Sequence, residues 1–151
     1  MPSFRTSHVV NHSPQQMFDL VADIESYPQF VPLCQSLRIR RRFVGQGGSE
    51  TLIADMEVGY KAIREKFTSR VSLDRTARRI GVEYVDGPFS HLENTWVFAE
   101  AEDGRCRVDF FIAYEFRSRA LAALMGNMFD AAFRKFASAF EQRADQVFRT
   151  A

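Results

Sequence analysis

The hydrophobic and polar positions of the chain follow three successive patterns. Residues 4–10 alternate as in a half-buried strand, and residues 14–27 then carry apolar positions at helical spacing. From about residue 36 to 117 the period is two, which predicts consecutive antiparallel strands joined by hairpins. The expected turns between these strands are rich in Gly, Asp and Pro and fall at residues 45–48, 74–76, 86–88 and 102–104.

The first helix has start and stop signals of its own. Ser13 is placed to cap it, Pro14 suits its first position, and Gln16 completes a capping box. Since Pro28 forbids a regular continuation, we expect the helix to end near Tyr27. The chain therefore opens with one strand and one or two short helices.

A long amphipathic helix is predicted after Ser118, its expected cap, through the end of the chain. Its apolar residues recur every three or four positions, and about 30 residues make a helix of roughly 45 Å. We expect a kink or hinge at Gly126 and Asn127, where helix propensity is poorest. Such a hinge would let residues 118–126 lift as a gate for a ligand and touch a membrane surface.

A helix this long with so broad an apolar stripe needs a concave partner, which a twisted antiparallel sheet supplies. We therefore predict an α+β fold in which about six or seven strands wrap around the C-terminal helix, as one domain over residues 1–151. Two short helices follow the first strand. The space between sheet and helix is either a tunnel for an apolar molecule or a large filled core.

Composition and charge narrow the function. The chain holds 15 Phe, 4 Tyr and 1 Trp, so most of its aromatic surface has no polar group and requires a core or an apolar guest. The net charge of +1 excludes a generally basic DNA binder. Residues 34–79 nevertheless hold 11 Lys and Arg against 5 Asp and Glu, which predicts one basic flank. Without a long apolar run or a leader-like start, we expect a cytoplasmic protein, or one peripheral at the inner membrane.

Metal and nucleotide chemistry lack sequence support. His8, His12 and His91 fall in different predicted elements, without the spacing of metal ligands. Cys34 and Cys106 are too isolated to indicate a disulfide framework or a zinc site. There is no glycine-rich phosphate loop either. From these three observations together we expect no metal and no catalytic cofactor.

Glu65 is the first candidate for a polar function. Strand alternation puts Glu65 and Ser69 on the same inward face as Phe67, where a carboxylate is costly unless it is paired or protonated. Glu65 is then a contact for a ligand head group or a general acid or base. Alternatively it lies near the end of the sheet and pairs with Arg64 or Arg70.

Two further groups have two interpretations each. Asn94, inward like Trp96, and His91 at the preceding turn either donate hydrogen bonds at the mouth of a cavity or satisfy turn backbone. Arg38, Arg40 and Arg42 would share one solvated strand face, which could contact the phosphates of RNA or anionic lipid. They could equally be the charges that keep an edge strand from pairing.

Several segments together resemble one family, the coenzyme Q-binding/ribosome association toxin family. The matching residues are Leu20-Val21-Ala22-Asp23 with Tyr27-Pro28, Phe30 and Pro32; Val58-Gly59-Tyr60-Lys61 with Glu65 and Phe67-Thr68-Ser69-Arg70; Gly87-Pro88-Phe89; His91-Leu92 with Trp96 and Phe98; and Phe116-Arg117, Ala139-Phe140 and Arg143-Ala144. The resemblance implies the START-like helix-grip fold of the polyketide cyclase/dehydrase superfamily. It also implies ubiquinone binding without catalysis, as in mitochondrial members, or association with the large ribosomal subunit, as in bacterial ones.

Our leading hypothesis is a non-catalytic carrier or chaperone of ubiquinone or a related isoprenoid lipid, supporting respiratory electron transport. Its partners would be the lipid and, transiently, a membrane surface or the respiratory chain. The second hypothesis is a ribosome-associating protein, and the third a cyclase or dehydratase using Glu65 or His91. The expected ligand-binding residues are Met56, Val58, Phe67, Trp96, Phe98, Phe110, Ile112, Met128 and Phe136, with Glu65 and Asn94 as polar partners.

Overall fold

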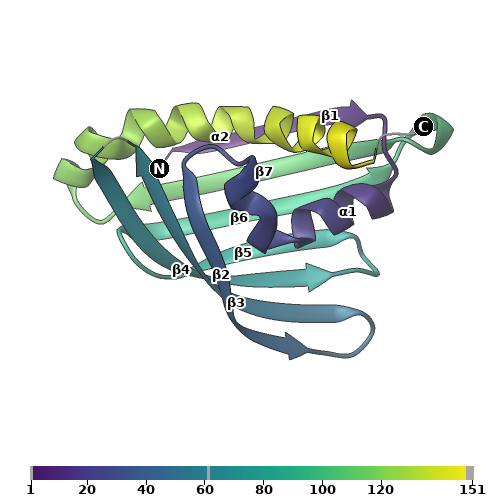
Figure 1. Cartoon of the computed structure of the whole chain (residues 1–151), viewed down its shortest axis with the longest axis horizontal. Helices are drawn as coiled ribbons and strands as arrows, with labels where there is room; N and C mark the ends of the chain where they lie inside the picture. The colour runs from purple at the N-terminus through teal and green to yellow at the C-terminus, as the bar shows by residue number, and fades with distance from the viewer. Residues whose placement is uncertain (1, 61, 149–151) are drawn as a thin grey trace.

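One antiparallel sheet curls around a long helix in the computed structural model, which describes residues 2–60 and 62–148 (Figure 1). The helical elements are α1 (Pro14–Ala22), the 3-10 turns η1 (Ile24–Gln29) and η2 (Glu102–Gly104), and α2 (Arg119–Val147). The strands are β1 (Ser3–Val10), β2 (Cys34–Val44), β3 (Ser49–Tyr60), β4 (Ile63–Asp74), β5 (Arg79–Asp86), β6 (Phe89–Glu100) and β7 (Cys106–Phe116). The predicted α+β helix-grip fold is confirmed.

The sheet has seven strands in the order β1-β7-β6-β5-β4-β3-β2, and every neighbouring pair is antiparallel. Figure 1 shows α2 running along β1 and β7, whereas β2, β3 and β4 cross beneath at a steep angle. Register shifts at several β-bulges, among them one between Ile39 and Arg41, increase the local twist. The sheet therefore presents a concave face to α2.

The capping box predicted for α1 is present. Ser13 Oγ accepts from the Gln16 amide at 3.1 Å, and Gln16 Oε1 accepts from the Ser13 amide at 3.0 Å. The expected end near Tyr27 is wrong, because the α-helix stops at Ala22 and a 3-10 turn that contains Pro28 follows. The Tyr27 hydroxyl donates to the Val21 carbonyl and so holds this turn against the end of α1.

The long C-terminal helix begins as predicted, with Ser118 Oγ accepting from the Leu121 amide at 3.1 Å. Over its 29 residues it continues through Gly126 and Asn127 without a break, so the expected kink does not interrupt it. Its buried residues are Met125, Phe129, Ala132, Phe133, Phe140 and Ala144. Among the described residues, no helix is both long enough and apolar enough to cross a membrane.

Two groups of aromatic side chains fasten α2 to the sheet. Near its N-terminal half, Phe129 packs against Phe89 and Phe116, with ring centroids 5.7 and 5.5 Å apart. Near its C-terminal half, Phe140 contacts Trp96 at 4.9 Å and Tyr27 at 5.2 Å. Packing of the core thus largely explains the abundance of Phe. The candidate functional site lies beneath α2, between the clusters at Phe129 and Phe140.

Candidate functional site

An apolar cavity of about 100 Å³ lies between the concave face of the sheet and α2. The space beneath the helix is therefore not completely filled by Phe and Met side chains. The lining residues come from η1, the loop that follows it, strands β2 to β7, and α2: Ile24, Tyr27, Val31, Pro32, Leu33, Cys34, Leu37, Ala54, Met56, Val58, Phe67, Ser69, Val71, Ile80, Val82, Leu92, Asn94, Trp96, Ile112, Phe129, Ala132, Phe133, Phe136 and Phe140.

The register of the sheet builds the floor of this cavity. Val71, Val82, Asn94 and Ile112 are successive cross-strand partners from β4 to β7, so their side chains share one row on the inward face. Ile80 and Trp96 form part of the next row.

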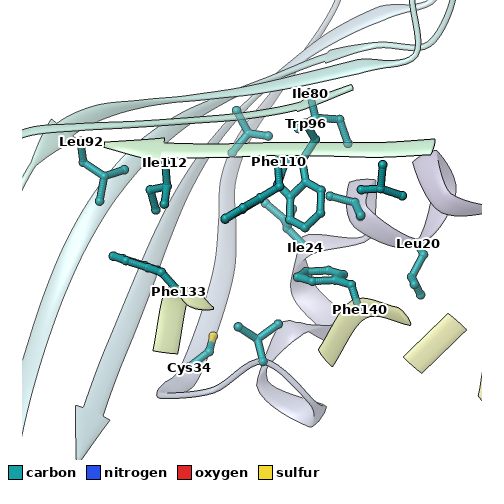
Figure 2. Packing of buried hydrophobic residues seen from close by; sticks show 14 of the residues in the cluster. Leu20, Ile24, Cys34, Ile80, Leu92, Trp96, Phe110, Ile112, Phe133 and Phe140 are labelled. Carbon is teal, nitrogen blue, oxygen red and sulfur yellow. The ribbon is translucent and has the colours of Figure 1, made fainter. Parts of the chain in front are cut away.

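The roof comes from α2, whose Phe side chains recur at helical spacing. Figure 2 shows Phe133 and Phe140 projecting from α2 toward Ile112 and Trp96 of the sheet, with Cys34 on another side. Phe133 and Phe136 meet edge to face with centroids 5.2 Å apart. These rings set the height of the cavity.

The size of the cavity limits its guest. Apolar cavities of about 150 Å³ take up a benzene-sized molecule, and this one is smaller. A larger guest therefore requires the Phe side chains of α2, or α2 itself, to move outward. Met56, which also lines the cavity, is a flexible side chain suited to such a change of shape.

The cavity reaches the surface beside the edge strand β2. The lining residues there are only half-buried: Pro32 and Leu33 of the loop before β2, Leu37 of β2, Met56 of β3 and Phe136 of α2. Leu33 has a φ of +67°, which is unusual for a bulky residue, and its carbonyl accepts from the Gly59 amide at 2.9 Å. The mouth is thus lined by apolar side chains, and the loop before β2 is held in place by its hydrogen bond to β3.

Among the residues that the structure describes, no Asp, Glu, Lys, Arg or His lines the cavity. Its titratable lining groups are the Tyr27 hydroxyl and the Cys34 thiol. Burial raises the pKa of Cys34 to about 11 and raises the pKa of Tyr27 still further. Both groups are neutral at physiological pH, so the cavity is suited to an uncharged guest.

Asn94 is inward, as predicted, but it serves the protein itself. Its Nδ2 donates to the Phe111 carbonyl at 2.8 Å, and its Oδ1 accepts from Trp96 Nε1 at 3.1 Å. Asn94 therefore fixes the orientation of the single tryptophan in the cavity wall. It satisfies a strand carbonyl, which neither of the two interpretations of this residue anticipated.

Seven of the eleven residues expected to bind a ligand line the cavity: Met56, Val58, Phe67, Asn94, Trp96, Ile112 and Phe136. Phe98 and Phe110 are inward but outside the cavity lining: Phe98 meets Phe18 of α1, and Phe110 meets Phe4 of β1, the edge strand opposite β2. Met128 is half-buried beside the buried line of α2, which passes through Phe129. The loop residues and Phe133 were not anticipated, although Phe133 lies in the apolar stripe of the helix.

Glu65 and His91 do not form an acid–base pair. Glu65 is half-buried on the inward face near the β3–β4 hairpin, outside the cavity lining. The expected pairing with Arg64 or Arg70 is wrong, because these project from the other face, toward Glu57 and Glu83 respectively. The register places His91 on the outward face too, with Nε2 3.2 Å from Glu93 Oε1.

The arginines of β2 do not share one face. The bulge between Ile39 and Arg41 reverses the alternation, so Arg38 pairs in register with the outward Asp55, whereas Arg42 pairs with the buried Leu52. Arg42 instead contacts Glu50 at 2.6 Å, and Arg40 makes two 3.0 Å hydrogen bonds to Asp55. On the outward face Arg41 takes the place predicted for Arg42.

Within residues 2–60 and 62–148, no cluster of three or more His, Cys, Asp or Glu side chains could hold a metal ion.

Comparison with known proteins confirms the resemblance indicated by the sequence segments. The sequence model of the family described as polyketide cyclase/dehydrase and lipid transport matches residues 10–141. The chain is 35% identical over 152 residues to the ribosome association toxin RatA of Rickettsia prowazekii, covering 99% of this chain and 100% of that protein. It is 30% identical over 149 residues to the mitochondrial coenzyme Q-binding protein COQ10 homolog B of Xenopus laevis, covering 96% of this chain and 59% of that protein.

A solved structure shares both fold and sequence. The 18 kDa protein of Caulobacter crescentus superposes with a TM-score of 0.78 at 36% identity, covering 99% of this chain and all of that one. START-like proteins are also among the structural neighbours.

Proposed function

The chain belongs to the polyketide cyclase/dehydrase and lipid transport family, and from this premise we propose that it binds ubiquinone or a related isoprenoid lipid beneath α2. The observation that carries the proposal is the uncharged, apolar cavity with a half-buried mouth beside β2. Burial of apolar area contributes about 25 cal/mol per Å², so a few isoprenoid units are enough for useful affinity. The name of the Xenopus laevis relative gives independent support.

We further propose that the protein carries or shelters this lipid without transforming it. Acid–base catalysis needs ionisable groups that converge on one point, and the described residues of the cavity lining include neither a carboxylate nor a histidine. The lipid is then a ligand, not a cofactor. Its delivery would support respiratory electron transport through transient contact with a membrane or the respiratory chain.

Fluorescence of Trp96 tests ligand binding directly. Trp96 is the only tryptophan and lines the cavity, so a short-chain ubiquinone should quench its emission saturably. Ala132→Leu places a bulky group in the lining and should weaken binding at least about fivefold, because overpacking a closed site costs about 1–3 kcal/mol. Its matched control is Ala131→Leu, one residue away on the exposed side of α2.

The control should quench as the unmodified protein does, and circular dichroism should show that both variants are folded. Mass spectrometry of lipids that co-purify from the native host gives a second measurement. A protein that shows no saturable quenching and carries no extractable lipid would contradict the proposal.

A second candidate function is association with the ribosome. The basic side chains on the outward face of β2 and β4 favour it: Arg38, Arg40, Arg41, Arg64, Lys66 and Arg70. Phosphate-rich RNA binds such surfaces through charge neutralisation. Since this basic outer face and the cavity lie on opposite sides of the sheet, the two candidate functions are compatible in one molecule.

A further inference from the structure

Among the residues whose burial the structure describes, Ser69 is the one buried polar residue, with 6% of its surface exposed. It lies in the middle of β4, on the inward face, with Ala54 of β3 and Tyr84 of β5 as its cross-strand partners. Its side chain lines the cavity on the third strand from the edge of the sheet at which the mouth opens. A hydroxyl therefore lies on the floor of a largely apolar cavity.

The other polar side chains of the lining already have partners. The Tyr27 hydroxyl donates to the Val21 carbonyl, and the Cys34 thiol points to the Ser36 carbonyl at 3.8 Å. Asn94 donates through Nδ2 and accepts through Oδ1. Each of these three groups thus already has a hydrogen-bond partner within the protein.

Ser69 differs from them, because its hydroxyl makes no hydrogen bond to any described residue. No completely covered side-chain oxygen or nitrogen lacks a partner in the described part of the chain, so Ser69 Oγ must keep accessible surface. The cavity that it lines is where that surface lies. A buried hydroxyl without a partner is unfavourable until a ligand atom supplies one.

We propose that Ser69 is the hydrogen-bonding anchor for one oxygen of the ligand head group, an inference that rests on the proposed lipid-binding function. The ligand class is a neutral amphiphile with a carbonyl or hydroxyl oxygen on its ring and a hydrocarbon tail. A serine hydroxyl donates to a carbonyl and accepts from a hydroxyl, so this anchor serves the oxidised and the reduced form of a quinone alike.

The same placement sets the orientation of the ligand. The polar end reaches inward to Ser69, and the tail leaves past the apolar, half-buried Pro32, Leu33 and Leu37 at the mouth. A charged head group is disfavoured, because the described lining residues offer no opposite charge to balance it.

The test compares two ligands that differ only in their ring oxygens: a short-chain ubiquinone and an alkylbenzene with the same tail. Ser69→Ala should weaken the quinone about fivefold, the size of one net hydrogen bond, and leave the alkylbenzene unchanged. Ser72→Ala, which removes an exposed hydroxyl from the same strand, is the control and should change neither. Affinities come from quenching of Trp96 or from calorimetry.

The possible outcomes separate the anchor from the function. If the unmodified protein binds neither ligand, the proposed function fails and the anchor with it. If the unmodified protein binds the quinone but Ser69→Ala weakens neither ligand, or weakens both equally, the anchor is overturned and lipid binding stands. Thermal unfolding without ligand adds a check on the fold. Ser69→Ala should melt at the same temperature or higher, and a clear drop would reveal a protein partner for the hydroxyl and overturn the anchor.

Discussion

Gly87, between β5 and β6, occupies a position that no other residue fits. Its φ is +145°, and a Cβ there would lie 2.5 Å from the Cβ of Phe67 and 3.0 Å from the Lys66 carbonyl oxygen. Phe67 belongs to the cavity wall. A tight turn at one end of the sheet thus determines where a lining side chain sits.

We expect Gly87→Ala to lower the free energy of unfolding by about 2–4 kcal/mol, the sum of backbone strain and overpacking. Chemical denaturation measures it. Gly81→Ala in β5 is the control, because a Cβ there meets nothing within 4 Å, and it should be neutral or slightly stabilising. Equal effects of the two substitutions would contradict the role assigned to the turn.

At the residue scale, the sequence is informative wherever alternation runs undisturbed. It places Met56, Val58 and Phe67 on the inward face correctly. Alternation cannot reveal the extra residue of the bulge near Arg40, so Arg42 was assigned to the wrong face. Phe98 is predicted to line the cavity; it lies on the predicted face but outside the lining, because Phe18 of α1 packs against it, a contact that depends on the whole fold.

At the scale of elements, α2 is unevenly anchored. Residues 119–124 include no buried side chain, and Leu124 is 61% exposed, whereas all buried residues of the helix lie between Met125 and Ala144. Local opening is favoured where few apolar contacts hold a segment. The helix is continuous, so a gate at residues 118–126 would be a motion of this weakly held segment, and it stays a prediction.

Gly126→Ala tests that gate. A Cβ at Gly126 would meet nothing within 4 Å, so the substitution should stabilise the helix by about 0.5–1 kcal/mol and slow amide exchange at residues 118–126. In the unmodified protein those amides should exchange faster than residues 130–145, and the variant should take up ligand more slowly. Exchange at one common rate along the helix would rule the gate out.

The element boundaries show which signals are local. Ser13, Gln16 and Ser118 cap their helices within a few residues, so the sequence predicts both starts. The end of α1 was misplaced because the 3-10 turn is held by the hydrogen bond between the Tyr27 hydroxyl and Val21, which neither capping nor periodicity encodes. The apolar stripe of α2 is broad, so its pattern does not show which residues lie at its centre. Phe129 is buried there, whereas Met128 is not among the buried residues.

At the scale of the whole molecule, the sheet separates two surfaces with different chemistry. The described lining of the cavity is uncharged, and the basic outer face carries Arg38 and Arg41, which form no ion pair with any described residue. The sequence predicts one packed and one solvated face, because a period of two distributes residues to the two faces. Whether the space beneath α2 is empty or filled depends on tertiary packing, which the pattern of the sequence does not determine.

We expect Arg38→Glu with Arg41→Glu to reduce co-sedimentation with ribosomal subunits, and added salt to weaken it in the unmodified protein. Quenching of Trp96 by quinone should be unchanged, because the substituted side chains lie across the sheet from the cavity. The matched control, Arg105→Glu with Arg107→Glu, reverses equal charge near the distant β6–β7 turn. If neither double substitution changes co-sedimentation, or if both reduce it equally, the basic outer face is not the ribosome-binding surface.

The absence of charge around the cavity also bears on electron transfer. A quinone that gains one electron becomes an anion, and an anion in a low-dielectric chamber without a cation or a spare proton nearby is strongly disfavoured. Described lining groups supply neither, since Tyr27 and Cys34 hold their protons well above neutral pH. If the proposed quinone binds there, it would resist one-electron reduction, and formation of the radical would be suppressed for as long as the quinone stays bound.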